Sequence, residues 1–219
     1  DFESPLLHKL TWPKVSWAPV LFDLDNDTDL DLFFANGHLN SVSGDNRQSN
    51  LLFENDGGGQ FTDISERSGV LSTGKRIHRS AIFADYDDDG KVDIFVTVNG
   101  QQVEDGQGNN IFDPNQGKGV LFHNETKSDN NWIKVRLEGT KSNRDGFGAT
   151  VAIKAGSIKD KQALVSGQGY FSAHAKEIYF GLGSVKSIDK IKVSWPSGMD
   201  QTFENIPANQ TVYILEGET

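Results

Sequence analysis

Short runs of alternating apolar and polar residues, separated by turn-forming residues, extend along the chain. In the clearest run, Ile133, Val135 and Leu137 alternate with charged residues. A strand with this pattern buries one face, so the apolar residues are expected to point into a core. The residues expected to face water are Lys134, Arg136 and Glu138.

The same pattern recurs through the last third of the chain. Further strands are predicted at Val151 to Ile153, Ala163 to Val165, Ile178 to Leu182, Ile191 to Trp195 and Val212 to Leu215. Six or more short strands separated by Gly, Asn, Ser and Pro predict an antiparallel β-sandwich of roughly ninety residues. No convincing amphipathic helix emerges, so the predicted fold class is all-β.

The first part of the chain contains a unit that occurs twice. Each unit has an apolar strand, an aspartate-rich stretch, a second strand ending in Asn-Gly, and a closing Leu-Phe-x-Asn segment. The closing segments are Leu51–Asn55 and Val120–Asn124. Repeats of about sixty residues built from short strands indicate solenoids or propeller blades. A polar stretch near 124–131 separates them from the sandwich, so we predict domains at 1–126 and 127–219.

The aspartate-rich stretches are ladders in the same register, Asp23–Asp31 and Asp85–Asp93, with carboxylates at loop positions 1, 3, 5 and 9. Calcium takes six to eight oxygens, and a backbone carbonyl at position 7 with waters would complete its shell. Without a cation, carboxylates this close repel one another. We therefore expect about two bound Ca²⁺ ions. The predicted ligands are Asp23, Asp25, Asp27, Asp29 and Asp31 in the first loop and Asp85, Asp87, Asp89, Lys91 and Asp93 in the second, Asp29 and Lys91 through their carbonyls.

The two loops differ at their sixth position. Gly90 can take the positive φ that a sharp turn needs there, whereas Thr28 is β-branched and strained in that conformation. The first site is therefore expected to be weaker or differently shaped. An EF-hand would need a glutamate at position 12, where these loops have Phe34 and Val96.

These features resemble a known group of proteins. The strand, aspartate loop, Asn-Gly and Leu-Phe-x-Asn series is similar to the FG-GAP/VCBS-type repeats of calcium-containing β-propellers, integrin α-subunit heads among them. The later series resembles the ASPIC/UnbV domain, in the order seen in the cartilage acidic protein family and its bacterial relatives. Its motifs are Asn143–Ala149, Gly167–Tyr170, Phe180–Gly183, Val193–Gly198 and Asn205–Gln210. The resemblance implies propeller-blade-like repeats, calcium binding and an extracellular or envelope location.

Two repeats are fewer than the four to eight blades that close a propeller. Alone, two blades would leave sheet edges open and apolar faces uncovered. Either the chain is the C-terminal part of a longer propeller, or the repeats pack on the sandwich or on another subunit. The chain opens at Asp1 rather than Met, so we expect a processed product or an excised piece.

Composition narrows the classes of partner. The 219 residues carry a formal charge of −10, which disfavours nucleic acid and anionic membrane surfaces. No apolar run approaches the length of a membrane span. The chain has no cysteine, so bound calcium could supply the stapling that disulfides often give secreted domains. We expect an extracellular, cell-surface or periplasmic location.

The residues favour binding over catalysis. The regular aspartate spacing makes these carboxylates metal ligands rather than an acid and base pair, and calcium activates water weakly compared with zinc. No Gly-x-Ser-x-Gly elbow is present. His38, His78, His123 and His174 lack the spacing of a transition-metal site. We expect no enzyme activity.

Two functional hypotheses remain open. The first is a calcium-stabilised structural or interaction module of the adhesion type, which contacts a protein partner or another copy of itself, or a glycan. The second is a non-catalytic accessory domain of a larger secreted enzyme, with a carbohydrate-processing role. Aromatic residues that could stack on a sugar are expected mostly in cores or interfaces. These residues are Trp12, Trp17, Trp132, Trp195, Tyr170 and Tyr213.

Overall fold

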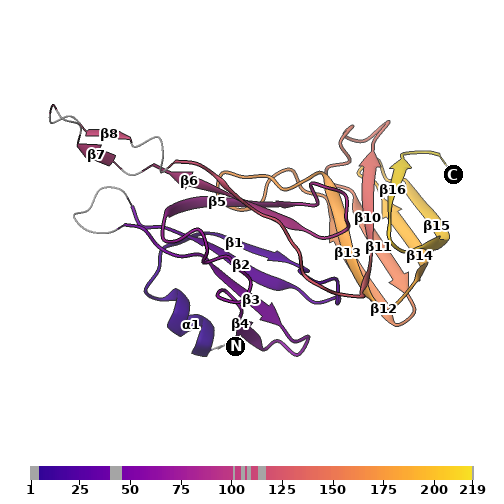
Figure 1. The fold of residues 1–219 in the computed structure, drawn as a ribbon. Helices are drawn as coiled ribbons and strands as arrows, with labels where there is room; N and C mark the ends of the chain where they lie inside the picture. Colours follow the sequence, from indigo (N-terminus) through magenta and orange to yellow (C-terminus); the bar gives the residue numbers. More distant parts are fainter. Residues whose placement is uncertain are drawn as a thin grey trace.

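The computed structural model describes residues 5–39, 46–100, 102–104, 107, 110–112 and 117–218. Nearly all of its regular structure is strand, which confirms the all-β prediction. The strands form two parts, a repeat region and a C-terminal sandwich, which lie side by side (Figure 1). One short helix, α1 (Pro5–Thr11), was missed, because seven residues are too few for an amphipathic period to show.

The strands of the repeat region form two main sheets and a small hairpin. The first sheet has the order β1-β2-β3-β4, the second β5-β6-β9, and the hairpin pairs β7 with β8. The strands are β1 (Ser16–Phe22), β2 (Asp31–Asn36), β3 (Leu51–Asn55), β4 (Phe61–Asp63), β5 (Ile77–Ala84), β6 (Asp93–Asn99), β7 (Gln102–Glu104), β8 (Asn110–Phe112) and β9 (Val120–Phe122). Each aspartate loop therefore joins the first two strands of its main sheet.

The two main sheets pack on one another around a shared apolar core. Strand β5 lies against β1 and β2. Alternate side chains of the strands meet there, among them Val20, Phe33 and Val96, which are fully or almost fully buried. Rings also meet across the two units, with Phe22 and Phe83 stacked at 6.2 Å between centroids. Each repeat therefore covers one face of the other repeat's main sheet.

The other face of the second sheet keeps apolar residues in contact with solvent. Ile82 pairs with Phe95, and Phe95 with Leu121, so the three form a row across β5, β6 and β9. Phe95 is 39% exposed and Leu121 47% exposed. Phe95 and Leu121 therefore keep a large share of their surface in contact with solvent.

The sandwich is built from two sheets with the orders β13-β10-β16 and β12-β11-β14-β15. Every pair is antiparallel, as expected, except β10 and β16, which run parallel. The strands are β10 (Asn131–Glu138), β11 (Thr150–Ala155), β12 (Ile158–Ala163), β13 (Glu177–Gly183), β14 (Ser187–Ser194), β15 (Asp200–Pro207) and β16 (Gln210–Leu215).

Two sandwich strands differ from the prediction. The strand expected at Ala163 to Val165 ends at Ala163, because its apolar residues lie at the end of β12 rather than within it. Strand β15 was missed, because polar Gln201 occupies one of its buried positions and accepts a hydrogen bond from Trp195 Nε1.

The sheet β13-β10-β16 has one face in the sandwich core and one face toward the repeat region. Ile178, Phe180 and Leu182 of β13 are buried in the core. The alternate residues, which include Tyr179 and Gly181, point to the repeats, because successive side chains of a strand leave opposite faces. This second face is where the sandwich meets the aspartate loops.

Candidate metal centre

The two aspartate loops are folded by the same backbone hydrogen bonds. In the first loop the carboxylate of Asp23 accepts the N–H groups of positions 5 and 6, at 3.1 and 3.0 Å. In the second loop the carboxylate of Asp85 accepts the same two N–H groups, both at 3.0 Å. The position-1 aspartate therefore organises its own loop in both repeats.

The position-9 aspartates tie each loop to the closing segment of its repeat. Asp31 accepts the N–H of loop position 2 at 2.7 Å and that of Asn55 at 2.9 Å. Asp93 accepts the equivalent pair, with Asn124 N–H at 2.7 Å. Both carboxylates belong to residues only 2% exposed. The closing asparagine of the repeat thus has a structural role that its spacing alone did not reveal.

The backbone turns sharply at two positions in each loop. The sixth residues, Thr28 and Gly90, have φ of 91° and 87°, which confirms the expected positive φ and the strain at Thr28. The fourth residues, Asn26 and Asp88, have φ of 63° and 60°. Asn and Asp tolerate this left-handed conformation better than most residues.

This shape brings carboxylate oxygens together. In each loop three aspartates place one oxygen apiece within 4.8 Å of one another: Asp23, Asp25 and Asp27 in the first loop, and Asp85, Asp87 and Asp93 in the second. Asp89 forms a further group with Asp87 and the imidazole of His123. Among the described residues, these groups do not include Asp29 or Asp31. The metal role of the Asp29 and Lys91 carbonyls stays a prediction.

Two further oxygens at the first loop are buried without a hydrogen-bond partner. They are Oδ1 of Asp29 and Oδ1 of Asn55. A buried oxygen without a partner is costly, and a bound cation is one way to satisfy it. The clustered carboxylates of Asp23, Asp25 and Asp27 are donors of the kind that a hard cation such as Ca²⁺ prefers. The residues of the first loop therefore fit the expected ion.

The first loop is electrostatically crowded. Burial, reinforced by the neighbouring aspartates, raises the pKa of Asp23 to about 7 and that of Asp31 to about 7. Burial and the charges of Asp27 and Asp25 raise the pKa of Asp29 to about 6. Among the described residues, no Lys or Arg forms an ion pair with an aspartate of this loop. A divalent cation would stabilise all of these carboxylates in their charged form.

The second loop has basic partners of its own. Lys134 Nζ lies 2.9 Å from Asp85 Oδ2 and 2.5 Å from Asp88 Oδ1. Lys91 Nζ lies 3.1 Å from Asp89 Oδ2, and His123 Nε2 lies 3.1 Å from Asp87 Oδ2. The prediction that Lys134 faces water is wrong, because its residue is only 1% exposed. At Lys134, the second loop covers the face of β10 that is opposite the core, whereas Arg136 on the same face is exposed.

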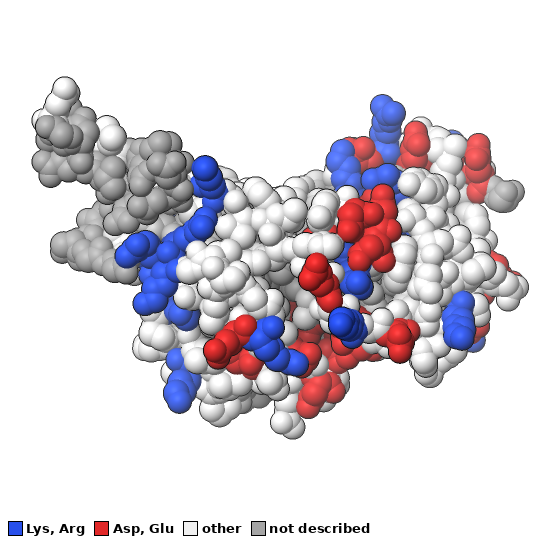
Figure 2. All heavy atoms as spheres, viewed as in Figure 1, with Lys and Arg blue, Asp and Glu red and all other residues white. Residues whose placement is uncertain are grey.

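Both loops are pressed against the sandwich and against each other. The Asn26 side chain donates to Gly90 O at 3.2 Å, which joins the loops, and Asn26 O accepts Gly183 N–H at 2.9 Å. A Cβ at Gly181 would overlap Asp23 Oδ2, and one at Gly90 would overlap the Trp132 ring. Glycine is therefore required on each side of the contact. Acidic side chains gather where the two parts meet (Figure 2).

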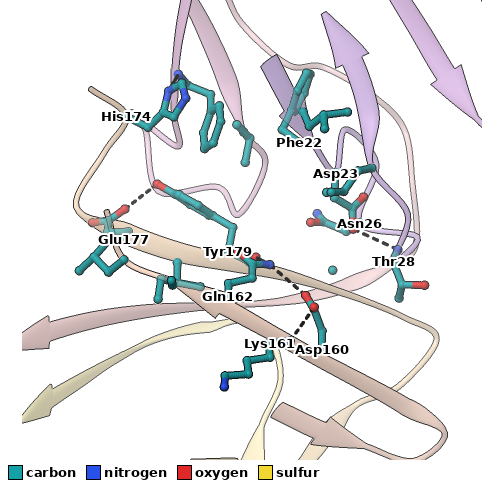
Figure 3. Close-up of a pocket in the computed structure, with 18 of the residues that line it drawn as sticks. Phe22, Asp23, Asn26, Thr28, Asp160, Lys161, Gln162, His174, Glu177 and Tyr179 are labelled. Carbon is teal, nitrogen blue, oxygen red and sulfur yellow. Dashed lines mark hydrogen bonds between the residues drawn. The ribbon is translucent and has the colours of Figure 1, made fainter. Parts of the chain in front are cut away.

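A partly open cleft of about 810 Å³ lies beside the first loop. Figure 3 shows Asp23, Asn26 and Thr28 on one side of it and Glu177 and Tyr179 on the other. The Tyr179 hydroxyl donates to Glu177 Oε2 at 2.6 Å and accepts Asp85 N–H at 3.2 Å. Burial raises the pKa of Tyr179 and keeps its proton in place for the bond to Glu177. The cleft wall thus connects β13 to the second loop.

Sequence reasoning identified the aspartates but missed the residues that hold them. Lys134, Trp132 and Gly181 belong to the sandwich, and nothing in the loops marks them. The sequence contained one sign of this contact: Trp132 lies two residues before Lys134, on the face of the strand that was expected to contact water. An indole there indicates that another part of the protein covers the face.

Comparisons with known proteins agree with this organisation. Residues 23–96 match the family described as FG-GAP-like repeat, and residues 139–219 match the family described as ASPIC and UnbV. Human cartilage acidic protein 1 is 25% identical over 219 residues, which is 99% of this chain and 30% of that protein. The mouse protein of the same name is 25% identical over 201 residues, 90% of this chain and 28% of its own length. The chain thus spans under a third of these relatives.

Within the described ranges of the chain, no helix is long and apolar enough to cross a membrane.

Proposed function

We propose that this chain, an FG-GAP-like repeat region followed by an ASPIC and UnbV domain, is a non-catalytic extracellular interaction module whose aspartate loops bind calcium. The observation that carries the proposal is the repeated frame of the two loops. In both, the position-1 and position-9 carboxylates accept equivalent backbone N–H groups while neighbouring carboxylates converge. A structural motif preserved in this detail across two repeats has a shared ligand as its simplest explanation.

The ligand chemistry favours calcium. The converging donors of the first loop are oxygens, which suit a hard cation, whereas zinc sites are built mainly from nitrogen and sulfur. Each loop spans only nine residues, so an ion bound there would hold the connection between two strands rigid. Two bound Ca²⁺ ions would bring the formal charge of −10 to about −6.

The proposed location is extracellular, on the cell surface or in the periplasm. Similarity to a protein named for cartilage supports this placement. Calcium modules in such environments bind with dissociation constants of about 10⁻⁴ to 10⁻³ M, and we expect affinities in this range. A role as an accessory domain of a secreted enzyme stays a prediction, and the described residues offer no specific support for it.

The interaction surface that we propose is the outer face of β5, β6 and β9. Its row of Ile82, Phe95 and Leu121 is apolar and partly exposed. The opposite face of this sheet already packs on the first repeat, so a further sheet of the same type is the occupant that best continues the arrangement. The relatives have about two thirds of their length outside this match, which leaves room for such sheets.

Thermal melts of chelator-stripped protein with and without calcium test the proposal. An ion present at 100 times its Kd stabilises the folded state by about 2.7 kcal/mol per site. For a chain of this size, that corresponds to a rise in Tm of about 5–10 °C per site. Asp23→Asn and Asp85→Asn should each reduce the rise, because each removes a carboxylate from one of the two sites.

Asp189→Asn is the matched control, because Asp189 is an exposed aspartate of β14 that pairs with Lys154 at 3.4 Å. It should leave the calcium-dependent rise unchanged. Equal behaviour of all three variants would show that calcium acts elsewhere or not at all.

A further inference from the structure

Lys134 is a buried charge that the sandwich contributes to the second aspartate loop. Its side chain is 1% exposed, and its ammonium group contacts Asp85, which is 0% exposed, and Asp88. Glu177 of β13 lies 3.9 Å away, so three carboxylates surround one ammonium. Burial opposes the charge, but the hydrogen bonds to Asp88 and Asp85 outweigh it and raise the pKa of Lys134.

The first loop meets the same sheet without a positive charge. Asp23 Oδ2 lies against the backbone of Gly181, and a side chain there would overlap it. Gly181 is paired with Trp132 across β13 and β10, and Lys134 is paired with Tyr179 two residues along. The position-1 carboxylates of the two loops therefore dock on one sheet face, one against glycine and the other against an ammonium group.

We infer that Lys134 is a tethered counter-cation that holds the second loop folded and docked on the sandwich without a metal ion, whereas the first loop depends on a dissolved cation. This inference rests on the proposed calcium binding for the first loop only. An ammonium group that donates to Asp85 and Asp88 neutralises part of the charge that would otherwise open the loop. The first loop has five aspartates and, among the described residues, no cationic partner.

The arrangement gives the two sites different dependence on calcium. In the stripped protein the second loop keeps the sandwich attached, because Lys134 and Trp132 of β10 remain in place. Calcium then orders the first loop against Gly181 and completes the contact between the two parts. An ion at the second loop shares Asp85 with the ammonium group, so its binding is opposed by a nearby positive charge.

Hydrogen exchange of the stripped wild-type protein tests the inference without a variant. The amides of Asp89 and Gly90 donate to Asp85, and those of Asp27 and Thr28 make the equivalent bonds to Asp23. We expect the amides of Asp89 and Gly90 to exchange at least about tenfold more slowly than those of Asp27 and Thr28. Equal exchange in the two loops would overturn the inference.

Lys134→Met supplies the second test, because methionine fills similar volume without the charge. In the stripped variant the amides of 85–93 should exchange about as fast as those of 23–31 in the wild type, and calcium should slow both. The second site should then bind calcium roughly tenfold more tightly, since the opposing charge is gone. Unchanged exchange in 85–93 would contradict a holding role for Lys134.

Lys192→Met is the matched control, because Lys192 of β14 pairs with Asp200 at 2.8 Å and both side chains are exposed. It should change neither loop. If Lys134→Met folds only with calcium, the result supports the inference. If it does not fold at all, the hydrogen exchange of the stripped wild-type protein decides whether the inference holds. Should calcium not bind the wild type, the proposed function fails, but slow exchange in 85–93 of the same protein would still support the role of Lys134.

Discussion

Gly181→Ala should separate the sandwich from the first loop. The added Cβ would overlap Asp23 Oδ2 and lie 2.8 Å from the carbonyl carbon of Asn26, so both cannot stay where they are. Moving Asp23 weakens its hydrogen bond to Thr28 N–H, and moving Asn26 weakens the bond from Gly183 N–H to its carbonyl. The perturbation therefore combines steric overlap with lost hydrogen bonds.

The magnitude follows from these contacts. Overpacking costs about 1–3 kcal/mol, and each lost hydrogen bond about 1 kcal/mol. We expect a loss of about 2–5 kcal/mol in the free energy of unfolding, which lowers Tm by about 5–15 °C. Because Asp23 is displaced, the calcium-dependent rise in Tm should also shrink.

Urea unfolding followed by tryptophan fluorescence, with and without calcium, measures both effects. Gly167→Ala is the control, because the nearest atom to a Cβ there is 3.9 Å away. A Gly181→Ala protein within about 0.5 kcal/mol of the wild type would refute the tight contact between loop and sandwich.

Three further predictions concern single residues. Thr28→Gly should raise the free energy of unfolding by about 1 kcal/mol, because the φ of 91° at Thr28 is strained for a β-branched residue, and urea unfolding would detect it. Burial lowers the pKa of His78 to about 4, so the unfolded chain binds this proton more readily and the free energy of unfolding falls as pH drops from about 6.5 to 4. In His78→Leu the number of protons taken up on unfolding in this range should be smaller by about one, so the free energy should fall less steeply with pH. An identical pH dependence in the variant and the wild type would contradict the buried, neutral His78. Glu216→Gln should lower Tm by about 5 °C or more, because the Glu216 carboxylate accepts hydrogen bonds from the N–H groups of residues 140–142 and from two serine hydroxyls. An unchanged thermal melt would show that these hydrogen bonds do not stabilise the fold.

Much of the local architecture could be read from the sequence. Alternation at Ile133, Val135 and Leu137 placed β10 and its buried face correctly, because a strand that borders a core must alternate. The two aspartate ladders and the sixth-position turn followed from spacing and from the steric freedom of glycine. These features depend on neighbours in the chain, which a single sequence displays directly.

The contacts between the two parts could not be read in the same way. Alternation shows that Lys134 leaves the sandwich core, but not that another loop covers it, because that depends on how two separately patterned sheets meet. His123 and Asp87 are 36 residues apart and meet only through the pairing of β6 with β9. Helix α1 was missed for the opposite reason, since seven residues carry too little pattern.

Titration calorimetry of calcium into the chelator-stripped protein tests the central claim most directly. The account predicts two bound ions per chain, one lost in Asp23→Asn and the other in Asp85→Asn, with unequal affinities in the wild type. A flat titration, or binding that neither substitution alters, would contradict the assignment of the aspartate loops as calcium sites.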